Sequence, residues 1–155
     1  MKKFLFSFVA LLFLTYLLLE VTPILFYSTA LAVESTKYSI SLLNIPVSVS
    51  ENAFIFPNAT MLVTSECNGL KPILLFISAI IAYPAKVTLK ISWTVFSILF
   101  LQLINIIRIT FLAWLLQDNV IWFDLFHDIV TPAILLMVSV SIFHTYTTLA
   151  NDSLK

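Results

Sequence analysis

The sequence predicts an all-α integral membrane protein of about four transmembrane helices, with a small extracytoplasmic β-structured segment between the first and second helices. The chain of 155 residues is 61% hydrophobic and only 10% charged, whereas charged residues make up about a quarter of an ordinary soluble domain. This composition excludes a soluble fold, and the length predicts one membrane domain, residues 1–155. The formal net charge is zero and the basic residues form no patch, so we expect the lipid bilayer as a partner and no nucleic acid.

The first apolar run, residues 4–32, is predicted to form transmembrane helix one because it is long enough to cross a hydrocarbon core of about 30 Å. Its last residues, Ala30 to Ala32, also fit the small-residue site at which a signal peptidase cleaves, so a removed signal peptide is the alternative. A retained helix is favoured, because the apolar stretch before Glu20 ends far upstream of that site and a second apolar stretch follows Pro23.

Residues 33–66 have a different pattern, in which polar residues alternate with apolar or β-branched ones. Such alternation is typical of half-buried strands. It occurs in three stretches, at residues 37–43, 45–50 and 61–66. Turn signals lie at residues 44–46 and 57–58. We therefore expect residues 33–66 to form the β-structured segment outside the bilayer.

Three further apolar runs complete the predicted bundle. They are transmembrane helix two at residues 69–85, helix three at 91–116 and helix four at 129–150. Helix two is short, since the apolar residues from Leu70 onward span only about 24 Å at the rise of an α-helix. Residues 117–128 are predicted as an extracytoplasmic loop. It contains aromatic residues that suit a membrane surface, Trp122, Phe123 and Phe126.

The distribution of lysine orients this bundle, because cytoplasmic loops are enriched in basic residues. With the N-terminus in the cytoplasm, most lysines lie on the cytoplasmic side: Lys2, Lys3, Lys86, Lys90 and Lys155. Lys37 and the membrane-edge Lys71 remain outside. We therefore expect a multi-pass protein of the cell membrane with both termini in the cytoplasm and with residues 33–66 and 117–128 on the outer face.

This topology brings three chemically reactive side chains to a similar depth at the outer face. Cys67 precedes helix two, and His127 precedes helix four. Arg108 lies about 12 Å below the outer end of helix three. An arginine within a membrane helix costs about 2.5–3.5 kcal/mol on insertion scales, so it usually faces the protein interior and has a partner or a function. Asn105 lies one turn earlier on the same face.

Cys67 and Gly69 are the only cysteine and the only glycine of the chain. A single cysteine forms no internal disulfide, no Cys/His spacing predicts a metal site, and no motif predicts a cofactor. Gly69 allows a backbone conformation that other residues tolerate poorly, which suits a tight turn that presents a nucleophile. His127 is a candidate base, because imidazole exchanges protons near neutral pH, and both Asp124 and Asp128 are near enough in sequence to orient it.

Each of these residues also has a purely structural explanation. A lone cysteine is often a buried packing residue, and a histidine in a loop can simply lie at the membrane interface. Arg108 could extend its guanidinium to the outer headgroups. It could also form an ion pair with an acidic residue of the outer face, which would be Glu66, Asp124 or Asp128.

Three short motifs follow one another in the chain, each at the outer end of a membrane segment. They are "ECNGL" at 66–70, "NIIRI" at 105–109 and "FH" at 126–127. Together they resemble the exosortase/archaeosortase family of membrane-embedded cysteine transpeptidases or proteases, over roughly residues 62–132. The resemblance implies that Cys67 is the nucleophile, Arg108 the oxyanion-stabilising residue and His127 the acid/base. Gly69 and Asn105 match the glycine and the asparagine of the family's motifs and would support the site.

The resemblance also implies the substrates, which would be exported proteins with a C-terminal motif, a transmembrane helix and a basic tail, cleaved at the outer membrane face. Two other functions stay open: a non-enzymatic membrane subunit, and a small transporter in which Arg108 binds an anion. The ionisable residues of helices two to four cluster at the outer end apart from His144, which counts against transport. A thiol redox protein would need a second, resolving cysteine.

Overall fold

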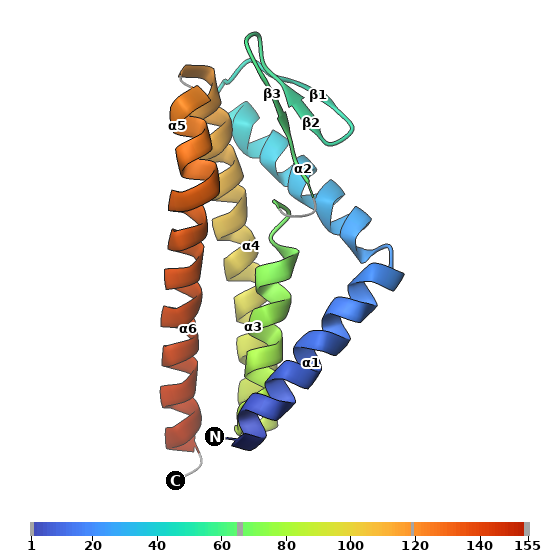
Figure 1. The fold of residues 1–155 in the computed structure, drawn as a ribbon. Helices are drawn as coiled ribbons and strands as arrows, with labels where there is room; N and C mark the ends of the chain where they lie inside the picture. The colour runs from blue at the N-terminus through green and yellow to red at the C-terminus, as the bar shows by residue number, and fades with distance from the viewer. Residues whose placement is uncertain (1, 65–66, 119, 154–155) are drawn as a thin grey trace.

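The computed structural model describes residues 2–64, 67–118 and 120–153, and it is mostly helical (Figure 1). The helices are α1 (Lys2–Val21), α2 (Ile24–Leu42), α3 (Leu70–Ala82), α4 (Val87–Asp118), α5 (Val120–Leu125) and α6 (Thr131–Ser153), and a π-helical turn, η1 (Phe126–Val130), joins α5 to α6. The strands are β1 (Ser48–Ser50), β2 (Ala53–Ile55) and β3 (Thr60–Leu62). Helices α3, α4 and α6 run side by side, α1 leans against α3, and the sheet lies at the opposite end from the start of α1 and the end of α6 (Figure 1).

Two helical segments of the described chain are long and apolar enough to cross a membrane. They are Val87–Gln117, within α4, and Ile121–Ser153, which includes α6. A third span results if Phe4–Leu19 and Ile24–Leu42 count together as one bent span. Helix α3 has 13 residues, or about 20 Å of helix, and is too short to cross alone. The prediction of four transmembrane helices is therefore not confirmed, whereas a membrane protein with two clear spans, and up to three, is.

The first predicted helix is broken rather than continuous. Helices α1 and α2 meet at an angle of 81°, at Thr22 and Pro23. Proline has no backbone N–H to donate and clashes with the preceding turn, and this accounts for the break. Helix α2 then continues ten residues past the predicted end at residue 32. The candidate cleavage site at residues 30–32 lies inside α2, where Ala32 is fully buried.

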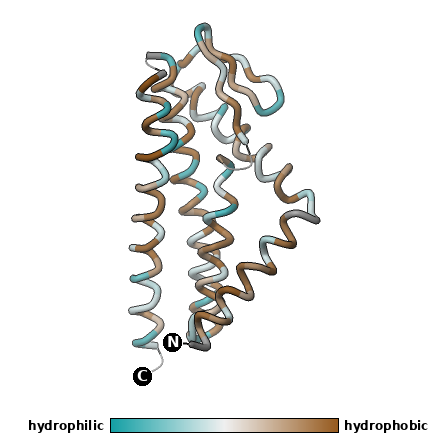
Figure 2. Tube along the Cα trace, in the orientation of Figure 1, coloured by the Kyte–Doolittle hydropathy of each residue, from teal (hydrophilic) through white to brown (hydrophobic). Residues whose placement is uncertain are grey.

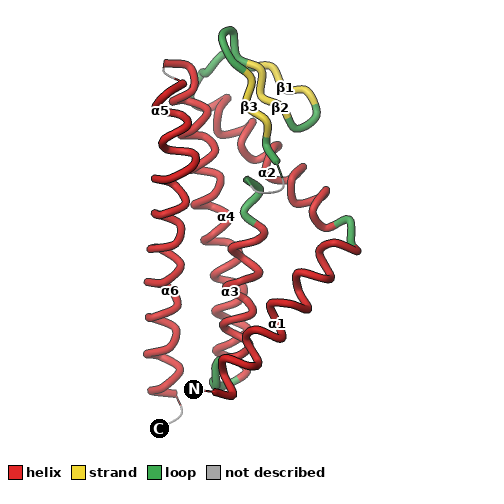
Figure 3. The backbone as a smooth tube through the Cα atoms, viewed as in Figure 1, coloured by secondary structure: helices red, strands yellow, loops and turns green. Residues whose placement is uncertain are grey.

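The β-structured segment is real but smaller than predicted. Figure 3 shows a sheet with the antiparallel order β1-β2-β3, and its second turn lies at the predicted position, residues 57–58. Residues 37–43, predicted as a strand, instead form the last turns of α2. Thr36 and Ile40 are four residues apart and both buried, which is helical spacing. The serine hydroxyls of this stretch donate hydrogen bonds to backbone carbonyls three or four residues earlier, so they have hydrogen-bond partners within the helix.

The described residues of the predicted loop, 117–118 and 120–128, are also helical. Helix α4 extends to Asp118, and α5, which begins at Val120, leads through η1 into α6. In contrast, the end of α3 follows directly from the sequence. Tyr83 is extended, with φ −77° and ψ 136°, because a residue before proline is disfavoured in the helical region, and Pro84 follows it.

Two apolar cores hold the elements together along α4. One lies beneath the sheet, where Phe54 and Met61 pack on α2 and on Leu112 of α4. The other lies at the far end, where Phe76 of α3 and Tyr146 of α6 pack around the first half of α4. Hydrophobic residues cover most of the helices, and hydrophilic ones gather at the turns of the sheet (Figure 2). The site described next borders the core beneath the sheet, against which Cys67 packs.

Candidate active site

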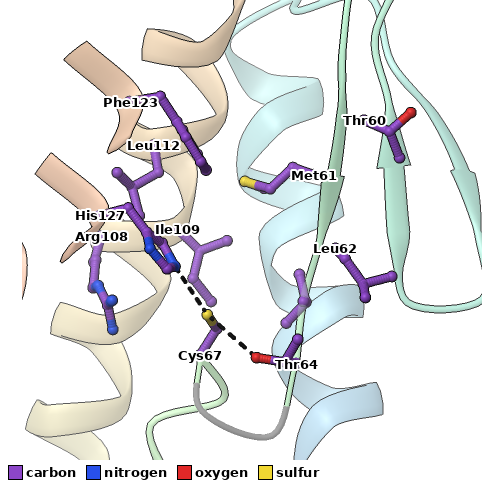
Figure 4. Close-up of a pocket in the computed structure, with 11 residues that line it drawn as sticks. Thr60, Met61, Leu62, Thr64, Cys67, Arg108, Ile109, Leu112, Phe123 and His127 are labelled. Carbon is purple, nitrogen blue, oxygen red and sulfur yellow. Dashed lines mark hydrogen bonds between the residues drawn. The ribbon is translucent and has the colours of Figure 1, made fainter. Parts of the chain in front are cut away.

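Three segments far apart in the sequence meet below the sheet (Figure 4). Cys67 lies in the turn before α3, Arg108 on α4 and His127 on η1. The Sγ atom of Cys67 lies 3.4 Å from Nε2 of His127, which is within hydrogen-bond reach for sulfur. The hydroxyl of Thr64 donates to the same sulfur over 3.7 Å.

The turn that carries Cys67 is held by its backbone. The N–H of Cys67 donates to the carbonyl of Thr64 at 3.0 Å, and Nδ2 of Asn105 donates to the carbonyl of Cys67 at 2.9 Å. Gly69 has φ +77°, a left-handed conformation that costs a residue with a Cβ about 1–2 kcal/mol. A Cβ on Gly69 would also lie 2.9 Å from Cγ and Nδ2 of Asn105. The only glycine therefore lets the turn adopt this conformation and lets Asn105 approach it.

Asn68 connects the same turn to α2. Its side chain is 1% exposed, and Nδ2 donates to the hydroxyls of Ser28 at 2.8 Å and Thr29 at 3.1 Å. Its Oδ1 accepts from the N–H of Leu70 at 3.0 Å. This bond pairs the first backbone N–H of α3, so a single buried amide contacts α2, the turn and the start of α3.

The ring of His127 is oriented from two sides. Its Nδ1 lies 2.7 Å from Oδ1 of Asp128, and its ring stacks on Phe123 with centroids 5.5 Å apart and planes inclined by 17°. A carboxylate only accepts hydrogen bonds, so Nδ1 is the donor in this pair. In a neutral ring Nε2 then has the lone pair, and Nε2 is the nitrogen that lies toward the sulfur of Cys67. The sequence left open whether Asp124 or Asp128 contacts His127, and in the structure the contact is made by Asp128.

Arg108 is anchored through one edge of its guanidinium. Its Nε donates to Oγ1 of Thr131 at 2.8 Å, and Thr131 is buried at the start of α6. An arginine has five N–H donors, so this bond leaves the terminal amino groups for other acceptors. Among the described residues no ion pair joins Arg108 to Asp124 or Asp128. Glu66 lies outside the described residues.

His127 owes its position to η1, where one hydrogen bond spans five residues, from the N–H of Thr131 to the carbonyl of Phe126. Pro132 follows and supplies no N–H to the preceding turn, which favours this wider geometry. π-helical turns are rare and are frequent at functional sites. Here the turn lies next to His127, which contacts Cys67, and Thr131, which contacts Arg108.

Two cavities meet at this point. The first, of about 200 Å³, lies between β3 and the helices α4 and α5. The second is a groove of about 540 Å³ between α3 and α6. Cys67, Arg108 and His127 line both cavities, so the thiol is accessible from the sheet side and from the α3–α6 side.

The model of the transmembrane exosortase family matches residues 1–144. This chain belongs to that family. The match extends well beyond the motif region at residues 62–132 and includes α1, α2 and most of α6. Comparisons with curated proteins and with solved structures find no match. As an exosortase of this family, the chain is a membrane-embedded protein.

The structure brings together the predicted residues Cys67, Arg108 and His127, and it places the predicted supporting residues Gly69 and Asn105 against the Cys67 turn. Their catalytic roles stay predictions. Sequence reasoning missed the contacts of four further residues in this exosortase, which are Thr64, Asn68, Phe123 and Thr131. The sequence offered one indication that Thr131 lies near the site, which is that it follows His127 by four residues. That spacing places two residues on one face only if the residues between them are helical, and the sequence predicts a loop up to residue 128.

Proposed function

We propose that this protein is a membrane-embedded cysteine transpeptidase or protease that cleaves C-terminal sorting signals of exported proteins. The observation that carries the proposal is the 3.4 Å contact between the Cys67 sulfur and Nε2 of His127, in a member of the transmembrane exosortase family. A nucleophile within hydrogen-bond reach of a base that a third group orients is the general arrangement of covalent catalysis.

In the first step the Cys67 thiol transfers its proton to Nε2 of His127 while the sulfur attacks the carbonyl carbon of the substrate. The hydrogen bond from Nδ1 to Asp128 supports this role, because it holds the tautomer whose Nε2 can accept a proton. Phe123 restricts rotation of the ring from one face. Asp128 and Phe123 act as positioning residues in this step.

The attack converts the carbonyl oxygen to an oxyanion, which needs donors that are already in place. Arg108 provides them through its terminal amino groups, while its Nε is held by Thr131. The anchored cation interacts more strongly with developing negative charge in this partly buried place than it would in water. Arg108 therefore stabilises the transition state, and Thr131 positions it.

Collapse of the tetrahedral intermediate breaks the C–N bond, and the leaving amine takes the proton from Nε2 of His127. A thioester between Cys67 and the new C-terminus remains. His127 then accepts a proton from an incoming amine or water, which attacks the thioester and releases the sulfur. Attack by an amine gives transpeptidation, and attack by water gives hydrolysis.

The surroundings of the site fit a substrate that is anchored in the membrane. The thiol lies in a cavity that β3 lines, and the sheet lies away from the end at which α1 begins and α6 ends (Figure 1). With the termini in the cytoplasm, cleavage would occur at the extracytoplasmic face of the cell membrane. The substrate would carry a short motif, a transmembrane helix and a basic tail.

The decisive experiment compares cells that carry the wild-type chain with cells that carry Cys67→Ala or Cys67→Ser at equal protein level. The C-termini of membrane and secreted proteins are determined by mass spectrometry. We expect one or more exported proteins to keep their full C-terminus in both mutants and to lose it in the wild type. Identical C-termini in all three strains would reject the nucleophile and favour a non-enzymatic membrane subunit.

The single thiol offers a second readout on purified protein. Because Cys67 is the only cysteine, iodoacetamide reports on it alone. We expect His127→Ala to slow the labelling, since the sulfur loses the group that accepts its proton. The same labelling rate in His127→Ala as in the wild type would show that the imidazole does not affect the reactivity of the thiol, and it would contradict the proposed pair.

A further inference from the structure

Strand β3 is the edge of the sheet nearest the thiol. Only one of its edges pairs with another strand of the described chain, since the order is β1-β2-β3. The other edge faces the cavity that Cys67 and His127 line, and residues 60–64 form one wall of that cavity. An unpaired strand edge is a template for a further extended chain.

The register of β3 shows which backbone groups are available. The N–H of Val63 donates to the carbonyl of Asn52 at 2.8 Å, and Met61 lies opposite Phe54. Backbone groups of successive residues in a strand point to alternate edges. Since the backbone N–H and C=O groups of Val63 and Met61 point toward β2, the backbone groups of Thr60 and Leu62 point toward the other edge, on the cavity side.

Apart from Arg108 and His127, the opposite wall of this cavity is apolar. Ile109 and Leu112 of α4 and Phe123 of α5 line it, and the sulfur of Cys67 lies at its lower end (Figure 4). Five residues of extended chain cover about 16 Å, so the wall from Thr60 to Thr64 offers a track that ends near the nucleophile. The polar edge of β3 and the apolar helical wall suit an extended peptide with hydrogen bonds on one side.

The groove between α3 and α6 continues from the same three residues in another direction. It is lined mainly by apolar side chains, including Pro72 and Leu75 of α3 and Leu135 and Leu136 of α6. The apolar window of the segment that contains α6 is only 11% buried, so most of α6 is available for contact. An apolar groove along a membrane-spanning helix suits an apolar helix.

We propose that the substrate occupies both cavities, with its extended motif added to the free edge of β3 and its membrane segment in the α3–α6 groove. This inference rests on the proposed function. The motif precedes the cleaved bond, so its chain must run toward Cys67, and β3 also runs toward Cys67. The added strand is therefore parallel to β3, and the cleaved bond lies where the two cavities meet.

The test uses the full chain with a leucine analogue that carries a photoreactive diazirine, introduced at Leu62 or at Leu136. The substrate is the exported protein whose C-terminus differs between wild-type and Cys67→Ala cells, and irradiation is done in the Cys67→Ala background. Matched control sites are Ile55, on the same face of the sheet, and Met137, next to Leu136. Leu136 and Met137 are 64% and 65% exposed, but only Leu136 lines the groove.

We expect Leu62 to crosslink residues before the cleaved bond and Leu136 to crosslink residues of the membrane segment after it. Both yields should exceed those at Ile55 and Met137 several-fold. A probe at Thr60 should label positions about two residues farther from the cleaved bond than a probe at Leu62. The reverse order at Thr60 would overturn the parallel arrangement.

Equal yields at the control sites, or both probes on one side of the cleaved bond, would overturn the two-cavity path. In either case a difference in processing between wild-type and Cys67→Ala cells would leave the proposed function standing. If the two strains show no difference in any exported protein, the proposed function and the substrate path fail together.

Discussion

The contact between Arg108 and Thr131 gives the sharpest prediction, because it can be removed without changing the shape of the site. Thr131→Val keeps the volume and branching of the side chain and deletes the hydroxyl that accepts from Nε at 2.8 Å. Thr131 is 7% exposed, so water replaces the lost acceptor poorly. A hydrogen bond to a charged group contributes about 1.5–3 kcal/mol. If the whole loss falls on the transition state, cleavage slows by about 10- to 150-fold.

The control is the same substitution at a second buried threonine. Thr110 of α4 is 8% exposed, and its Oγ1 has no hydrogen-bond partner in the described part of the chain. Thr110→Val should therefore leave cleavage unchanged, and Thr131→Ser should keep most of the wild-type rate because the hydroxyl remains. The assay is the cleavage rate of a membrane-anchored substrate in detergent, with thermal unfolding as a check of the fold. Wild-type cleavage by a folded Thr131→Val protein would show that the anchor of Arg108 does not matter for the reaction.

Two further predictions concern groups that contact His127 and the turn that carries Cys67. Asp128→Ala should slow cleavage by up to about fivefold, because an exposed ion pair contributes at most about 1 kcal/mol. Asp128→Asn should have a smaller effect, because its amide oxygen also accepts a hydrogen bond. Equal effects of Asp124→Ala and Asp128→Ala in the same assay would argue against an orienting role of Asp128. Gly69→Ala should lower the free energy of unfolding by about 2–3 kcal/mol, from the left-handed backbone and from the hydrogen bond of Asn105 that the new Cβ displaces. Chemical denaturation in detergent measures this loss of unfolding free energy. The loss should be smaller in an Asn105→Ala background, where the new Cβ no longer meets the Asn105 side chain. A loss of the same size in both backgrounds would contradict a clash between the new Cβ and Asn105.

The proximity of Cys67, Arg108 and His127 could be predicted from the sequence because these residue types are rare and lie toward the ends of apolar runs. A single cysteine, a single arginine in the long apolar run at residues 91–116 and a histidine at the start of the last run left few candidates. The family motifs then narrowed them further. The depth of Arg108 in the membrane could be estimated closely enough to place it near Cys67 and His127, because an α-helix has a fixed rise per residue. An error of a few ångströms in that depth matters little, because the arginine side chain is long.

The elements around the site were harder to predict, for reasons that differ between segments. Alternation in residues 37–43 fits a strand, but serine hydroxyls that bond to earlier carbonyls make the same residues acceptable in a helix, and the burial of Ile40 against the sheet decides between them. Pro23 was visible inside the first run, but neither the size nor the direction of a bend follows from one proline. The contact of Thr131 with Arg108 depends on a π-helical turn, and Pro132 favours such a turn but does not by itself predict one.

The turn that carries Cys67 is held by contacts with several helices within the range that the exosortase family model matches. Cys67 contacts His127 of η1, its carbonyl is held by Asn105 of α4, and Asn68 is held by two hydroxyls of α2. Three consecutive residues, with Gly69 pressed against Asn105, thus depend on three separate helices. A buried donor that loses its acceptors costs about 1–3 kcal/mol, so displacing α2 would leave Nδ2 of Asn68 without the hydroxyls of Ser28 and Thr29 and would loosen the turn. The geometry at the thiol is therefore a property of most of the chain, including α2, which contributes no reactive group of its own.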